Sequence, residues 1–204
     1  MEVERAISVL EEVRLRLASC QRFRGFSGTA AILSGAVAVA AGLYQQVEAA
    51  YPRTPEEVGF YLHVWLACLA IALVLNYGAV GIWYFRRAER QERRQTHTAA
   101  FQLVPALVLG AVLSWVFLDH GLPHMLPGVW YACYGTGLLA ARALVPRGVW
   151  PVALAFCLAG GFLLLVTDPA LPLAWWVMPL GFGLGQMWTG RLLLLDRESE
   201  RVSP

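Results

Sequence analysis

The stretch SWVFLDHGLPHMLPGVW, from Ser114 to Trp130, indicates how this chain reverses direction. It holds two of the four histidines, His120 and His124, beside Asp119, and apolar sequence lies on both sides. Pro123 separates the two histidines, and proline interrupts helices because it lacks a backbone N–H and clashes with the preceding turn. We therefore interpret the stretch as a short polar turn between two apolar helices.

Apolar sequence of this kind extends over most of the chain. Of the 204 residues, 58% are hydrophobic and 15% are charged, whereas about 25% are charged in soluble domains. A soluble fold of this size could not bury so much apolar surface, so lipid is the expected solvent. The net charge of +2 is too small to indicate nucleic-acid binding. The four cysteines show no CxxC spacing, which argues against a disulfide framework or a zinc site.

Six apolar stretches are long enough to cross a bilayer, which takes about 20 residues in a helix. They cover residues 26–47, 58–85, 99–118, 125–145, 148–167 and 171–194. The sequence thus predicts an all-α polytopic membrane protein with six transmembrane helices. In this prediction residues 1–24 form a cytoplasmic helix, residues 25–195 the transmembrane domain and residues 196–204 a cytoplasmic tail. The first stretch is longer than the core of a signal peptide, so we expect it to be retained.

The arginines predict how the six stretches are oriented. The chain has no lysine, and fifteen of its sixteen arginines lie before the first stretch, in the second and fourth connections, and at the C-terminal end. Only Arg53 lies in an odd-numbered connection. Because positively charged loops stay in the cytoplasm, we expect both termini to be cytoplasmic and the protein to lie in a bacterial inner membrane.

The segment before the first stretch has the pattern of an amphipathic helix over residues 3–23. Its apolar residues recur at steps of three and four, at Val3, Ile7, Leu10, Val13 and Leu17. One interpretation is a helix on the inner membrane surface, with its arginines near anionic lipid. The other is a docking helix for a cytoplasmic partner or a second copy of the chain.

The even-numbered stretches share a short pattern near their inner ends. Each has an aromatic residue followed by glycine, eight or nine residues before an arginine, at Tyr77-Gly78, Tyr134-Gly135 and Phe182-Gly183. This predicts three helical hairpins, either from an ancient repeat or because glycine and aromatic residues are common in membrane helices. Since small residues let membrane helices approach closely, we expect a tightly packed bundle.

The sequence offers little for catalysis inside the membrane, so we do not expect an enzyme. None of the six stretches has Asp or Glu at its middle, and the chain contains neither a nucleophile elbow nor a phosphate-binding loop. The polar residues there suit hydrogen bonds between helices. Alternatively, the three hairpins surround a ligand cavity lined by Asn76, Tyr77, Tyr134, Phe182 and Gln186.

The histidines near the outer ends give two further hypotheses. Asp119, His120 and His124 are residue types that bind Zn²⁺ or Cu²⁺. Alternatively, a neutral imidazole of His63 or His120 ligates haem or chlorophyll. The helix break between His120 and His124 argues against the metal site, and the interpretation as a turn is preferred.

Three motifs resemble a known family: FRGFSG at residues 23–28, WYACYGTGLLAAR at 130–142 and PLGFGLGQMWTG at 179–190. The chain is similar to small bacterial inner-membrane proteins with six helices and no assigned activity, and the likeness covers most of its length. The resemblance implies a short charged helix followed by six spans. One departure is Gln186, where the family often has a histidine, so any ligand role of that histidine is lost or changed here.

These observations favour a non-enzymatic membrane protein, most simply a structural or accessory subunit of a membrane complex. Its expected partners are the lipid bilayer and other membrane subunits or further copies of itself. The first alternative is a transporter or sensor of a small molecule or lipid. The second alternative is a subunit that binds haem or chlorophyll.

Overall fold

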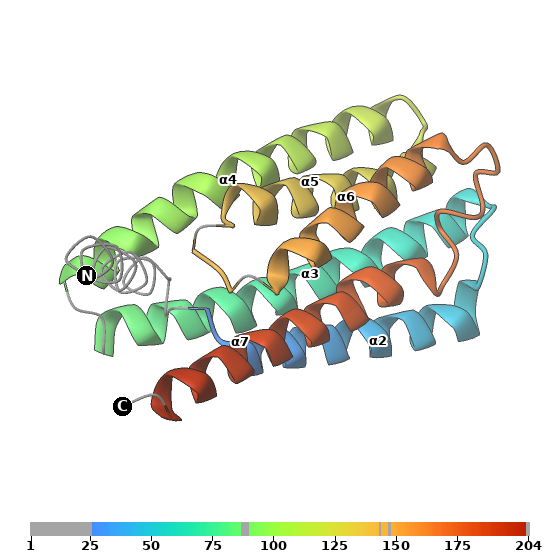
Figure 1. The fold of residues 1–204 in the computed structure, drawn as a ribbon. Helices are drawn as coiled ribbons and strands as arrows, with labels where there is room; N and C mark the ends of the chain where they lie inside the picture. The colour runs from blue at the N-terminus through green and yellow to red at the C-terminus, as the bar shows by residue number, and fades with distance from the viewer. Residues whose placement is uncertain (1–25, 87–89, 143, 147, 203–204) are drawn as a thin grey trace, which may run out of the picture.

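A computed structural model describes residues 26–86, 90–142, 144–146 and 148–202, and these form helices joined by turns, without a β-strand. The predicted amphipathic helix lies outside the described residues. In chain order the elements are α2 (Gly28–Ala49), α3 (Pro55–Arg86), α4 (Arg90–Asp119), η1 (Pro123–Met125), α5 (Leu126–Ala140), α6 (Val149–Leu165), η2 (Pro179–Gly185) and α7 (Gln186–Val202) (Figure 1). The predicted all-α fold is confirmed.

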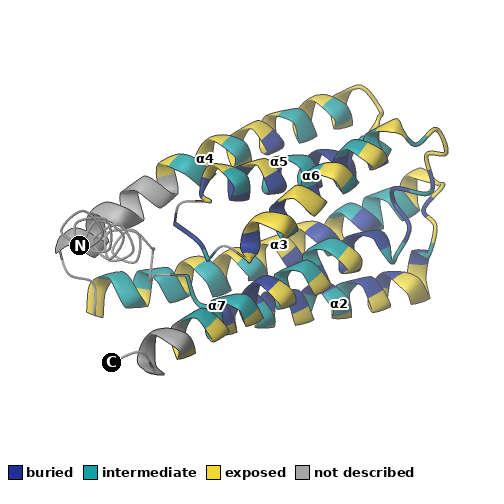
Figure 2. Cartoon of the chain, in the orientation of Figure 1, coloured by how far each residue is buried: buried dark blue, intermediate teal, exposed yellow. Residues whose placement is uncertain are grey.

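Three helices of the described part are long and apolar enough to cross a membrane, as judged by length and composition. They are α2, α3 and the portion Phe101–Asp119 of α4, while α6 is apolar but shorter. Large apolar side chains on the outer faces of α3 and α4 are exposed, and buried residues gather between the helices (Figure 2). This distribution suits a protein whose surroundings are lipid.

The helices form two groups of three (Figure 1). In the first group, α2 packs against both α3 and α7; in the second, α5 packs against both α4 and α6. The predicted pairs α2–α3 and α4–α5 are therefore neighbours. The third predicted hairpin is not confirmed, because α6 and α7 make few contacts with each other and each has its main partner elsewhere.

Glycines at seven-residue spacing explain why α7 packs against α2. A Cβ atom built on Gly28 would lie 2.6 Å from the carbonyl oxygen of Gly190, and one on Gly35 would lie 2.6 Å from that of Gly183. Gly42, seven residues further along α2, meets the ring of Pro179 in the same way. The two antiparallel backbones thus touch directly, an approach that only glycine allows at these positions.

Glycines that contact a neighbouring backbone also join α5 to α6. A Cβ atom on Gly135 would lie 2.7 Å from the carbonyl oxygen of Ala153, and one on Gly160 would lie 2.7 Å from that of Gly128. Here too the contacting residues of each helix are seven apart. Both of the closest helix pairs are therefore joined through matched small faces, although α5 and α6 follow each other along the chain while α2 and α7 are far apart in it.

The turn between α4 and α5 has the predicted form. α4 ends at Asp119, and Gly121 follows with φ +69°, a left-handed conformation that favours glycine. The short helix η1 leads into α5, where Pro127 lies in the first turn. The interpretation of this stretch as a turn between two helices is confirmed.

The sixth predicted stretch differs from the structure at its beginning. The prediction starts a helix at residue 171, but residues 166–176 form an irregular segment and helix resumes only just before η2. Pro169 and Pro172 disfavour helix there. The segment is nevertheless packed inwards, since Leu173 is buried and the backbone N–H of Trp175 donates to the carbonyl of Ala50 at 2.9 Å. We call residues 168–177, which cover most of this irregular segment and the first residue of the following helix, the outer segment, after the side of the membrane on which the predicted orientation places it.

A reciprocal pair of hydrogen bonds begins α3. The carboxylate of Glu57 accepts from the backbone N–H groups of Arg53 at 2.8 Å and Thr54 at 3.0 Å, and the Thr54 hydroxyl accepts from the Glu57 N–H at 3.3 Å. This is a capping box. The bonds from Arg53 and Thr54 stabilise the charged carboxylate and lower the pKa of Glu57. Glu57 precedes the apolar stretch predicted for this helix, so it belongs to the polar connection.

Candidate functional site

Four aromatic rings meet where the two groups of helices join. Tyr131 and Tyr134 come from α5, Phe156 from α6 and Phe182 from η2. Tyr131 and Tyr134 each contact both phenylalanines, and the phenylalanines contact each other, with ring centroids 4.9 to 5.3 Å apart in tilted or edge-to-face geometry. Such arrangements place the positive edge of one ring against the negative face of another. We call these four residues the aromatic cluster.

The helix η2, with the sequence PLGFGLG, contributes Phe182 to this cluster and packs against Tyr131 and Phe156. It forms a π-helix, a wide turn that is frequent at functional sites. Its three glycines make room for three different helices, with Tyr131 of α5 at Gly181, Val39 of α2 at Gly183 and Phe156 of α6 at Gly185. The hydroxyl of Tyr131 also donates a hydrogen bond to the carbonyl oxygen of Val177. The start of the last helix is thus the point at which both groups of helices meet.

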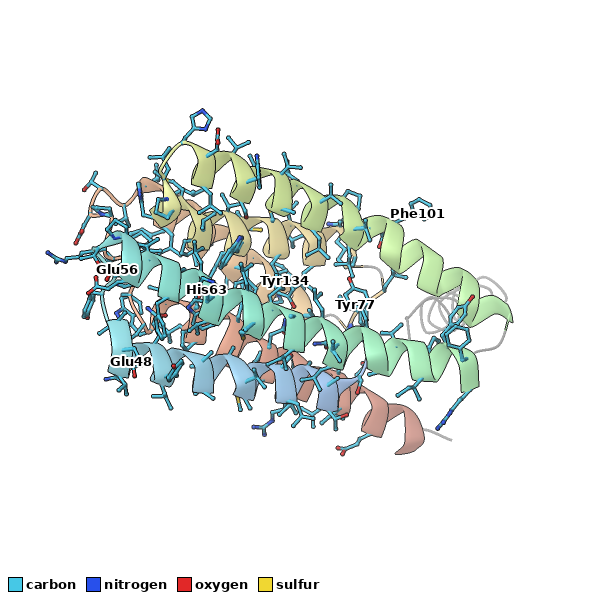
Figure 3. The ribbon with its side chains drawn as sticks, turned by 180° about the vertical axis from the view of Figure 1, so that it is seen from behind. Glu48, Glu56, His63, Tyr77, Phe101 and Tyr134 are labelled. Carbon is cyan, nitrogen blue, oxygen red and sulfur yellow. The ribbon has the colours of Figure 1, made fainter. Side chains whose placement is uncertain are left out.

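Three of the five predicted cavity residues come together here. The Gln186 side-chain Nε2 donates to the hydroxyl oxygen of Tyr134 at 2.6 Å, and the ring of Phe182 packs on Tyr134 at 5.3 Å. Tyr77 lies on α3, and its side chain is half exposed (Figure 3). Asn76 instead donates to the carbonyl of Ala72 in its own helix at 2.9 Å.

A second polar cluster lies between α2, α3 and the outer segment and was missed by sequence reasoning. Gln45 is fully buried, and its Oε1 accepts from the indole N–H of Trp65 at 2.8 Å. Its Nε2 donates to the carbonyl oxygens of Leu173 at 2.8 Å and Ala49 at 3.3 Å. Gln45 thereby ties α2, α3 and the outer segment together. A signal was present, because Gln45 continues the seven-residue spacing of the buried alanines Ala31 and Ala38.

The two histidines proposed as cofactor ligands share one local geometry. The Nδ1 atom of His63 lies 2.6 Å from the carbonyl oxygen of Gly59, and that of His120 lies 2.8 Å from the carbonyl oxygen of Val116. Since a carbonyl only accepts, Nδ1 is the donor in each bond, and in a neutral imidazole of this kind Nε2 has the lone pair with which a histidine binds a metal. Each histidine is therefore a candidate single ligand.

The predicted metal site has no such support. His120 Nδ1 and Asp119 Oδ2 are 3.9 Å apart and both side chains are exposed. His124 lies beyond the turn in η1. Within the described ranges, no three side chains of His, Cys, Asp or Glu are placed to hold a metal ion together. A metal site at Asp119, His120 and His124 stays a prediction without a coordination geometry.

Comparison with protein-family models, with curated proteins and with solved structures finds no match for this chain. The family resemblance that the motifs carry therefore stays a prediction, and function is inferred from the contacts described above.

Proposed function

We propose that the protein is a structural or accessory subunit of a larger membrane assembly. Its helices cross a bacterial inner membrane six times, with both termini in the cytoplasm. The shorter α5, α6 and α7 lie alongside the three long apolar helices, which supports six spans in one bilayer (Figure 1). The asymmetric distribution of arginine supports the orientation.

The observation that carries this proposal is a pair of open glycines three residues apart on α3, a feature that no other described helix has. Most helical glycines described above contact a neighbouring backbone or ring. On α3, a Cβ atom added to Gly78 or Gly81 would meet no described atom within 4 Å. Exposed apolar side chains surround these glycines, including Val74, Tyr77 and Ile82. Lipid tails do not require glycine, whereas a closely packed helix does, so this face of α3 suits a helix of another subunit.

The test is purification from the native membrane in mild detergent, with identification of the proteins that co-purify. A partner at stoichiometric amount is expected. The variant Gly78→Leu should reduce the amount of that partner at least tenfold while the protein itself accumulates normally. Gly161→Leu is the matched control, because Gly161 of α6 also has no described atom near its Cβ position. A single monomeric species from native membranes would contradict the proposal.

A second candidate function is a transporter or sensor of a small molecule or lipid. The convergence of Tyr134, Phe182 and Gln186 favours it, because one polar pair beside aromatic rings is the usual composition of a ligand site. A lipid or small molecule that co-purifies with the wild type and is lost in Gln186→Met would support this function. Retention of the same molecule by the variant would remove this site from consideration.

A haem- or chlorophyll-binding subunit is the third candidate, supported by the free Nε2 of His63. The purified protein should then absorb visible light, and His63→Leu should abolish the absorption. A colourless protein from native membranes would exclude this candidate.

A further inference from the structure

Tyr61 lies in the second turn of α3, inside the junction between the two groups of helices. Its side chain is fully buried in a cluster that includes Trp65, Tyr131 and Leu173. The centroid of the Trp65 ring is 6.3 Å from that of the Tyr61 ring, and Tyr131 packs in the same cluster. Tyr61 therefore brings a hydroxyl group into the apolar interior beneath the outer segment.

No residue that the structure describes forms a hydrogen bond with this hydroxyl. The polar side chains described near it are paired. Trp65 donates to Gln45, Gln45 donates to the carbonyl of Leu173, and Tyr131 donates to a backbone carbonyl. Among the buried side-chain polar atoms that the structure describes, only this hydroxyl and the Oε1 atom of Gln102 on α4 have no hydrogen-bond partner.

A buried hydroxyl without a hydrogen-bond partner makes folding less favourable. A buried hydroxyl without a partner loses its hydrogen bonds to water and gains none in return, and the loss is greater in a protein surrounded by lipid. Phenylalanine would fill the same space without this cost. Buried polar groups of this kind usually bind an internal water or a ligand that supplies the missing bonds.

The surroundings restrict what could bind. No charged side chain is buried among the residues that the structure describes, so a charged guest would lack a buried counter-charge. The carbonyl group of Leu173 accepts one hydrogen bond from Gln45 and has a second lone pair. Leu173, Ala174 and Val177 of the outer segment pack in the same buried cluster as Tyr61, so the guest must be small.

We infer that the Tyr61 hydroxyl binds a small neutral molecule that both donates and accepts hydrogen bonds, with water as the smallest member of this class. The site lies in the outer end of the junction, between α3, α5 and the outer segment. It does not depend on the proposed subunit function.

Whether Tyr61→Phe lowers or raises the melting temperature tests this inference. If the hydroxyl binds a guest, Tyr61→Phe breaks a bond that the folded protein makes, and the melting temperature in detergent should fall by about 2–4 °C. If the hydroxyl has no partner, the same variant removes an unpaired polar group, and the melting temperature should rise or stay the same. Tyr44→Phe is the matched control, because Tyr44 is exposed and also packs on an aromatic ring. A rise or no change for Tyr61→Phe would overturn the inference.

Two further measurements identify the guest. Native mass spectrometry of the wild type and of Tyr61→Phe would show an organic molecule as an adduct of the wild type alone. NMR transfer of magnetisation from water to the Tyr61 ring, in protein with labelled tyrosine, would show an internal water. Either result supports the site. An adduct-free protein in which Tyr61 receives no magnetisation from water would exclude it.

Discussion

The indole N–H of Trp130 on α5 donates a hydrogen bond to the hydroxyl oxygen of Ser114 on α4, across 2.8 Å. Ser114 in turn donates to the carbonyl oxygen of Gly110 in its own helix at 2.6 Å. These two residues are the ends of the stretch from which the turn was predicted. The bond therefore joins both helices of that hairpin one to two turns below the connection and restrains how they cross.

Replacement of Ser114 by Ala should destabilise the protein by about 1–3 kcal/mol, because the N–H of Trp130 would remain partly buried without an acceptor. The measurement is the unfolding free energy in detergent by chemical denaturation. In a double-mutant cycle, Ser114→Ala with Trp130→Phe should cost less than the sum of the single changes. Additive costs would show that the bond contributes nothing to stability.

Replacement of Gly35 by Ala tests the direct contact of α2 with η2 and α7. The added methyl group would lie 2.6 Å from the carbonyl oxygen of Gly183, so the helices must separate, at a cost of about 1–3 kcal/mol. Gly161→Ala is the control, since its Cβ position is open, and this change should be neutral or stabilising by up to about 1 kcal/mol. Equal melting temperatures for both variants would contradict the close approach.

Gln45 and Gln46 offer an unusually well-matched comparison of a buried and an exposed glutamine. Gln45→Met should cost about 2 kcal/mol or more, because it leaves the Trp65 N–H and the Leu173 carbonyl without partners. Gln46 is exposed, so Gln46→Met should change the unfolding free energy by less than about 0.5 kcal/mol. The indole fluorescence of Trp65 should also shift in the first variant alone. Similar costs at both positions would argue against the buried network.

Acid should weaken the beginning of α3 through Glu57. Its pKa is lowered in the folded protein, so the stability it adds is present above the ordinary carboxyl pKa of 4.5 and is lost as the pH falls through the lower folded value. Between about pH 6 and about pH 3, the wild type should therefore lose more stability than Glu57→Gln. Glu56→Gln should follow the wild type. The difference in stability loss between the wild type and Glu57→Gln will be small, because the Glu57 carboxylate is fully exposed and solvent screens its interactions.

Much of the local structure could be predicted from the sequence because it depends on neighbouring residues. Apolar runs gave the positions of the helices, and Gly and Pro gave the turn between α4 and α5. The same logic failed at the outer segment, where Pro172 lies in a run apolar enough to suggest a helix. There the buried segment is held by contacts with α2, which the local sequence does not contain.

The candidate site was only partly predictable. Tyr134 and Phe182 were selected from a shared pattern near helix ends and Gln186 as a polar residue within an apolar stretch, and the structure brings the three together. Tyr131 and Phe156 were missed, since aromatic residues in apolar helices carry no signal of which neighbour they contact. Their place in the aromatic cluster depends on the wide turn of η2, whose glycines admit them.

The sequence by itself determined the class of protein, because composition and the length of apolar runs depend only on what the chain must bury. It also determined where most helices begin and end. The tertiary structure alone decided the pairing of α7 with α2 and of α6 with α5. Small residues occur in all the helices from α2 to α7, so the pairing depends on which glycine faces match in depth and spacing. For α2 and α7 this match joins distant parts of the chain.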